Sequence, residues 1–137
     1  MQKSKPNRAV RNKIENSQLK VFLQIQLFAI VIYLIFFLMG SFIALTADVS
    51  GKYDYIISLV LFAISSFAIG FFTGIKLRQN GLLMGIVYSL PINILVLIVS
   101  LILNDFIFSF NILITLAVLI AFAGVGGVLA VNKRLRR

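Results

Sequence analysis

Residues 81–103 read GLLMGIVYSLPINILVLIVSLIL and contain no charged side chain. An α-helix needs about 20 mostly apolar residues to cross a hydrocarbon core about 30 Å thick. Inside lipid every backbone N–H and C=O group must find a partner within the protein, which favours a helix. The alternation of apolar and polar residues that marks an outer-membrane barrel strand is missing from this segment. We therefore expect residues 81–103 to form a transmembrane helix.

Three further segments of the same kind lie on either side of it, at residues 21–45, 56–75 and 106–131. The connections between the four segments are short, at residues 46–55, 76–80 and 104–105. Short connections make consecutive helices antiparallel neighbours. The sequence thus predicts an all-α fold, a four-helix transmembrane bundle of two antiparallel helix hairpins. The transmembrane domain is expected over residues 21–131, between basic tails at residues 1–20 and 132–137.

The composition supports this fold class and argues against enzyme chemistry. The 137 residues are 61% hydrophobic and 12% charged, against about 45–50% and about 25% in a soluble domain. Histidine and cysteine are both absent, which excludes disulfides, Cys/His zinc sites and His-assisted nucleophiles. A membrane enzyme would depend on Asp48, Asp54 and Asp105. We expect no enzyme activity and no catalytic, cofactor-binding or metal-binding residue.

The distribution of Lys and Arg predicts the orientation of the chain. Twelve of the 13 basic residues fall in the two tails or in residues 76–80, and only Lys52 falls on the other side. Cytoplasmic loops carry the excess of Lys and Arg, so both termini are expected in the cytoplasm of a multi-pass cell-membrane protein. The twelve orienting residues are Lys3, Lys5, Arg8, Arg11, Lys13, Lys20, Lys76, Arg78, Lys133, Arg134, Arg136 and Arg137.

The net charge of +9 also bears on partners. Basic residues at the ends of membrane spans are attracted to anionic lipid headgroups by roughly 1 kcal/mol each. We therefore expect the cytoplasmic leaflet, with its anionic headgroups, to be a partner, and we expect no binding to nucleic acid.

Rows of small residues recur at four-residue steps along three of the predicted spans. Such rows let helix backbones approach closely. They predict close packing within the bundle or between copies, and the alternative is a path or pocket lined by small residues. The predicted packing positions are Ser66, Gly70, Gly74, Gly81, Gly85, Ser89, Ala123 and Gly127.

Polar residues near the middle of the spans form a second candidate group. Pro91 removes one backbone donor and frees the carbonyl group of Val87, so a helix kink is expected there. The polar residues that we expect near mid-bilayer are Tyr33, Ser65, Ser66, Asn93 and Thr115. They are expected either to form interhelical hydrogen bonds or to line a binding site at a broken helix, as in transporters.

Two glycine-containing segments resemble a known family. These are KLRQNGLLMG at residues 76–85 and GGVLAVN at residues 126–132. Together they resemble a family of small four-span bacterial membrane proteins of unknown function, found mainly in Gram-positive bacteria. The resemblance covers residues 21–132 and implies the cytoplasmic membrane, and it carries no catalytic or ligand-binding residue.

Two functions remain open from the sequence. The first is a non-enzymatic membrane subunit that packs with itself or with a larger membrane-protein complex. The second is a homo-oligomeric small-molecule transporter or pore, including a holin-like pore. The spans contain no Asp, Glu, Lys or Arg, whereas proton and sodium relays in membranes usually use ionisable side chains. This absence favours the first function.

Overall fold

The fold is all-α over the residues that the structure describes. The computed structural model describes residues 8–47, 51–78, 80–103 and 110–135. Within them it has four helices and no strand, namely α1 (Arg8–Ala47), α2 (Gly51–Leu77), α3 (Gly81–Leu103) and α4 (Phe110–Leu135). Each helix contains a segment long and apolar enough to cross a membrane. The predicted fold class, an all-α protein with four membrane-spanning-type helices, is confirmed.

The helices extend beyond the predicted spans at several ends. α1 is 40 residues long and begins at Arg8, inside the segment expected to be a tail. No Gly or Pro interrupts residues 8–20, and Arg, Lys, Glu and Leu favour helix, so the helix continues beyond its apolar part. α2 likewise begins at Gly51, before the predicted residue 56. The predicted connection at residues 104–105 lies outside the described residues.

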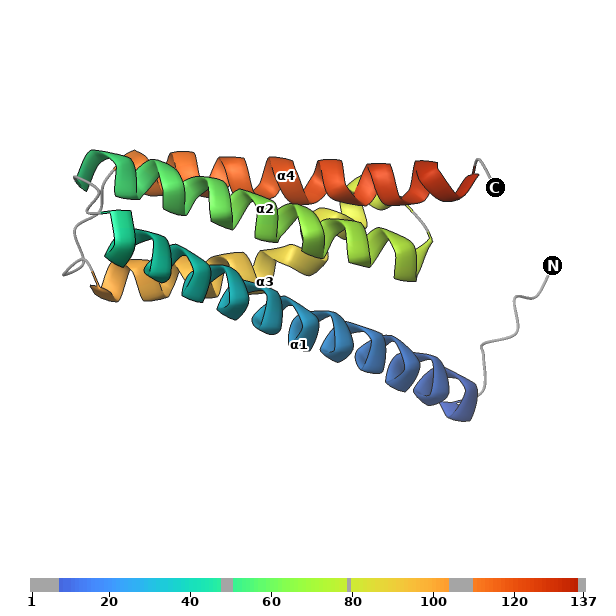
Figure 1. Cartoon of the computed structure of the whole chain (residues 1–137). Helices are drawn as coiled ribbons and strands as arrows, with labels where there is room; N and C mark the ends of the chain where they lie inside the picture. The colour runs from blue at the N-terminus through green and yellow to red at the C-terminus, as the bar shows by residue number, and fades with distance from the viewer. Residues whose placement is uncertain (1–7, 48–50, 79, 104–109, 136–137) are drawn as a thin grey trace.

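The start of α1, the end of α4 and the turn between α2 and α3 lie at one end of the bundle, which we call the terminal end (Figure 1). The end of α1, the start of α2, the end of α3 and the start of α4 lie at the other end. α4 packs most extensively against α2 and next against α3. α1 packs against α2 and α3, and it has no contact with α4 in the part of the chain that the structure describes. α1 is therefore the outermost helix, and α4 is held between α2 and α3.

The short turn between α2 and α3 uses left-handed backbone at two positions that are not glycine. Arg78 has φ of 56° and Asn80 has φ of 35°. The Arg78 N–H donates to the Gly74 carbonyl oxygen at 3.2 Å, and the Met84 N–H donates to the Asn80 carbonyl oxygen at 3.0 Å. The first bond ends α2 in the manner of a left-handed helix cap. The chain therefore turns directly after α2, and α3 runs back along it.

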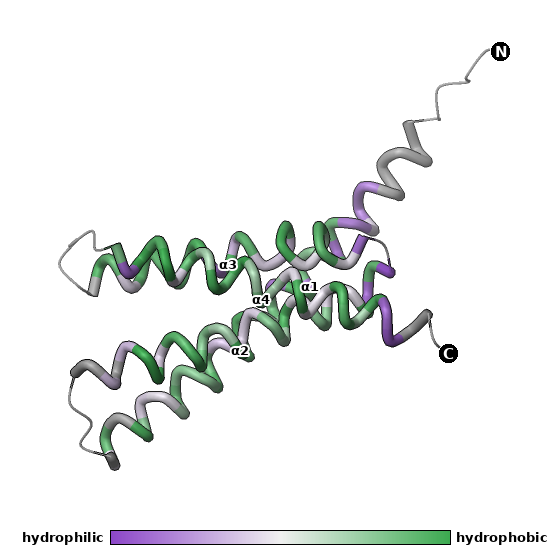
Figure 2. Tube along the Cα trace, turned by 90° about the horizontal axis from the view of Figure 1, so that it is seen from above, coloured by the Kyte–Doolittle hydropathy of each residue, from purple (hydrophilic) through white to green (hydrophobic). Residues whose placement is uncertain are grey.

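Most of the large apolar side chains face outward. On α1 the exposed fraction reaches 68% at Leu27 and Phe42 and 83% at Leu45. Figure 2 shows hydrophobic residues along the middle of all four helices, with hydrophilic residues gathered mainly at the end that carries the termini. This is the distribution expected of a protein whose solvent is lipid in the middle and water at the ends.

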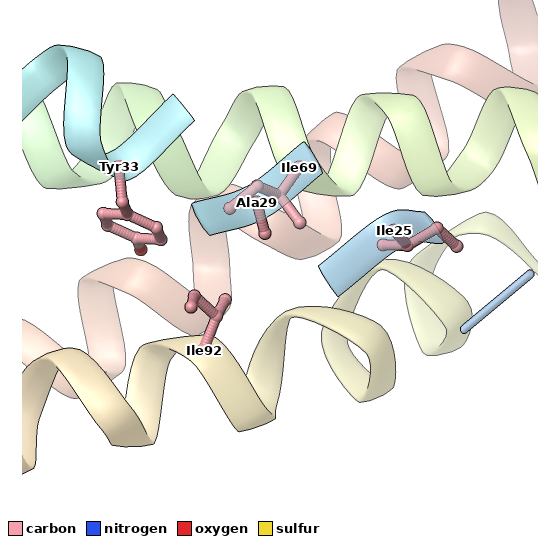
Figure 3. Close-up of a cluster of buried hydrophobic side chains, with 5 residues drawn as sticks. All are labelled: Ile25, Ala29, Tyr33, Ile69 and Ile92. Atoms are coloured by element: carbon pink, nitrogen blue, oxygen red, sulfur yellow. The ribbon is translucent and has the colours of Figure 1, made fainter. Parts of the chain in front are cut away.

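The buried apolar core lies where α1 meets α2 and α3. Figure 3 shows its five residues, Ile25, Ala29, Tyr33, Ile69 and Ile92. Aromatic pairs extend this contact toward the terminal end. The rings of Phe28 and Phe72 stack with centroids 4.0 Å apart, and those of Phe22 and Tyr88 lie 5.5 Å apart.

Candidate functional site

A chain of buried hydrogen bonds joins all four helices. The Tyr33 hydroxyl donates to Asn93 Oδ1 at 2.7 Å, and Asn93 Nδ2 donates to Ser66 Oγ at 3.2 Å. The Ser66 hydroxyl donates in turn to the Leu119 carbonyl oxygen at 2.8 Å. The residues come from α1, α3, α2 and α4 in that order. Asn93 and Ser66 are fully buried, and Tyr33 is 6% exposed. We call these four residues the polar chain.

The polar chain contains three of the five residues expected near mid-bilayer. Ser65 is buried, but its hydroxyl donates to the Leu61 carbonyl oxygen of its own helix. Thr115 belongs to a separate contact, because its hydroxyl donates to the Asn111 carbonyl oxygen and lies 3.1 Å from the Tyr55 hydroxyl. The five side chains therefore do not converge on one point.

Leu119 was not foreseen from the sequence, because its contribution is a backbone carbonyl group on an apolar residue. Gln26 is a second case. Gln26 lies near the middle of α1, and its Nε2 donates to the Tyr88 carbonyl oxygen at 2.8 Å. Lys76 was expected only to set orientation, yet its ammonium group donates to Gln24 Oε1 and lies 5.6 Å from the centre of the Phe72 ring.

α3 continues as one helix through Pro91. Pro91 is on the exposed side of α3, whereas Asn93, two residues further on, is fully buried. The asparagine side chain is thus held inside the bundle by α3 while the proline faces outward. α3 is helical on both sides of the proline, where the sequence predicts a kink.

Glycines bring α4 into backbone contact with α2. A Cβ atom at Gly70 would overlap the Ala123 carbonyl group, and one at Gly74 would lie 2.6 Å from the Gly127 carbonyl oxygen. A Cβ atom at Gly126 would overlap the Phe67 carbonyl group. Any side chain at these positions would force the two helices apart.

The same end of α4 touches α3 just as closely. A Cβ atom at Gly85 would lie 2.6 Å from the Ala123 carbonyl oxygen, and one at Gly81 would overlap the Gly127 carbonyl group. Gly124 differs, because its nearest neighbour would be the Ile86 side chain at 3.5 Å, an ordinary contact. We call the contact of α4 with α2 and α3 through these residues the glycine seam.

The remaining predicted positions are placed as follows. Ser89 is fully buried and donates to the Ile86 carbonyl oxygen of its own helix, so it does not bond across to another helix. The orienting residues within the described parts lie in the terminal halves of α1 and α4 and at the α2–α3 turn, all at the end of the bundle that carries the termini (Figure 1). Lys3, Lys5, Arg136 and Arg137 lie outside the described residues.

Acidic residues and buried polar atoms are the groups that could bind a ligand or a metal ion in this arrangement. Among the described residues no group of three or more acidic residues is placed to hold a metal ion. Asp48 and Asp105 lie outside the described residues. Every buried side-chain nitrogen or oxygen atom that the structure describes has a hydrogen-bond partner. The polar chain therefore links helices and leaves no buried polar atom unpaired.

The fold and the polar chain define a small protein with four membrane-spanning-type helices. Residues 18–130 match the family described as "Protein of unknown function (DUF3792)", and the chain belongs to this family. The match extends from α1 into α4 and so includes all four helices. No curated protein and no solved structure matches the chain. The resemblance to an uncharacterised family is thereby confirmed.

Proposed function

We propose that the chain is a non-enzymatic subunit of the bacterial cytoplasmic membrane that packs with itself or with a larger membrane-protein complex. The observation that carries this proposal is the polar chain, in which the buried polar side chains are used to join helices. A binding or catalytic site would instead offer polar groups to a substrate. Among the described residues such a buried unpaired group is absent.

The exposed apolar surface also supports a role in assembly. α1 has its polar chain contact at Tyr33 and its core contacts at Ile25 and Ala29 on one side only. Its other side is available to lipid or to another helix. In lipid, helices associate through close packing and interhelical hydrogen bonds, because lipid tails are as apolar as the side chains themselves.

The orientation is part of this proposal. The start of α1, the α2–α3 turn and the end of α4 lie at one end of the bundle, and in the sequence twelve of the 13 basic residues fall within or beyond these segments. The positive-inside rule then assigns this end to the cytoplasm. The resemblance to a mainly Gram-positive family supports the same membrane.

The experiment is isolation in a mild detergent after light cross-linking in cells, followed by identification of everything bound. A foreign membrane protein in fixed ratio, whose removal lowers the abundance of this chain, is the expected result for a subunit of a larger complex. A fixed number of copies of this chain is the expected result for self-assembly. A single uncomplexed chain would refute the proposal.

A homo-oligomeric transporter or pore is the second candidate, and the position of Pro91 favours it. Proline frees a backbone carbonyl group in the middle of α3, two residues from the buried Asn93. In several transporters, backbone carbonyl groups freed from helical hydrogen bonding near mid-membrane form part of the solute site. An Asn93→Leu protein that folds normally but loses solute binding would support this candidate. Growth arrest on overexpression would support its holin-like form.

A further inference from the structure

A surface hollow lies where the start of α3 meets the end of α4. Its volume is about 310 Å³, and it is lined by Asn80, Gly81, Leu82, Leu83, Val128, Val131 and Asn132. The two asparagines are exposed, and they form the polar side of the lining. The leucines and valines form the apolar side. The hollow thus changes from polar to apolar over a short distance.

Backbone donors add to its polar side. The first N–H groups of an α-helix have no acceptor within the helix, and in α3 the hydrogen bonding begins with Met84 N–H to the Asn80 carbonyl oxygen. The N–H groups of residues 81–83 therefore precede that first bond, and all three residues line the hollow. Such donors favour a negatively charged group.

The charge around the hollow has the matching sign. Arg78 and Lys133 are exposed and lie within two residues of the lining asparagines in the sequence. Acidic residues do not occur between residues 55 and 104 or after residue 105. The glycine seam forms the inner wall, since Gly81 lies against Gly127 and Val131. An occupant therefore needs a negative group at the rim and an apolar part along the wall.

We propose that this hollow binds one anionic phospholipid, with its phosphate at the asparagine rim and an acyl chain along Leu83 and Val128. A phospholipid has both required parts, and the hollow lies at the basic end of the spans, where headgroups meet acyl chains. Basic pockets between transmembrane helices on the cytoplasmic side bind phospholipid headgroups in this way. The inference is independent of the subunit function.

The test uses the whole chain, stripped of lipid in detergent and mixed with phosphatidylglycerol or phosphatidylcholine of identical acyl chains. Native mass spectrometry counts the lipids that stay bound. The expected result is one retained phosphatidylglycerol, at least about fivefold preferred over phosphatidylcholine. Asn132→Asp is expected to reduce phosphatidylglycerol retention by about tenfold or more, because it places like charge at the rim.

Two controls separate the hollow from general charge and from unfolding. Gln18→Glu adds the same charge at an exposed position of α1 at the same end of the bundle, and it is expected to reduce retention by less than about twofold because of screening by salt. Leu83→Trp narrows the hollow and should lower retention of both lipids. Leu95→Trp, on the exposed middle of α3, should leave retention unchanged.

Three results would overturn the proposal. Equal losses with Asn132→Asp and Gln18→Glu would show that net charge alone attracts lipid. Equal retention of the two lipids would remove the requirement for an anion. Displacement of phosphatidylglycerol by inorganic phosphate at equal concentration would show that the acyl chain contributes nothing.

Discussion

Replacement of Asn93 by leucine tests the role of the polar chain. The substitution removes two buried hydrogen bonds, from the Tyr33 hydroxyl at 2.7 Å and to Ser66 Oγ at 3.2 Å. Hydrogen bonds between membrane helices contribute about 0.6–1.7 kcal/mol each. The hydroxyl of Tyr33, a residue only 6% exposed, also loses its acceptor, which costs about 1–2 kcal/mol more. We expect Asn93→Leu to lower the free energy of unfolding by about 2–5 kcal/mol.

Titration with sodium dodecyl sulfate of protein in a mild detergent, followed by circular dichroism, measures this loss. Adding Tyr33→Phe removes the stranded hydroxyl, so the double variant should be less destabilised than the sum of the single variants. Ser65→Ala is the matched control, because Ser65 bonds only within α2. An Asn93→Leu protein no less stable than Ser65→Ala, or strict additivity of the two substitutions, would refute the reasoning.

Three further predictions concern the seam, the turn and the orientation. Gly127→Ala should lower the unfolding free energy by about 1–3 kcal/mol, because its Cβ atom would overlap the Gly81 carbonyl group. Gly124→Ala, measured by the same titration, should change the unfolding free energy little. Equal losses of stability in the two variants would contradict the close packing of α4 in the glycine seam. Arg78→Gly should raise the unfolding free energy by up to about 1 kcal/mol, because φ of 56° strains a side chain; a loss of stability would count against this account. In this cysteine-free chain, the Ser17→Cys variant should react with an impermeant maleimide only after the membrane is opened. The Thr46→Cys variant should react with the reagent while the membrane is still intact. The reverse pattern would show that the chain has the opposite orientation.

The fold class follows from the sequence because each span is long, apolar and uncharged. α3 begins at Gly81, because the preceding Asn80 and Arg78 adopt turn conformations. The ends of α1 were harder to place. Apolarity marks where lipid begins, whereas the helix itself ends only where a helix-breaking residue or a cap occurs. For that reason α1 extends to Arg8, well into the basic segment.

The polar chain was only partly predictable. Counting residues inward from each end places Tyr33, Ser66 and Asn93 at a similar depth, and depth is what the sequence encodes for them. Which way a side chain points depends on the rotation of each helix, and rotation is set by packing. Thr115 faces Tyr55 rather than Asn93 for this reason. The carbonyl group of Leu119 became an acceptor only because the glycine seam brings α4 close to α2.

The central claim is that this chain works within an assembly. Its most direct test is the mass of the complex extracted in a mild detergent at native abundance, measured by light scattering with the detergent contribution subtracted. The account predicts a mass greater than that of one chain. A mass equal to one chain, stable on dilution, would contradict it.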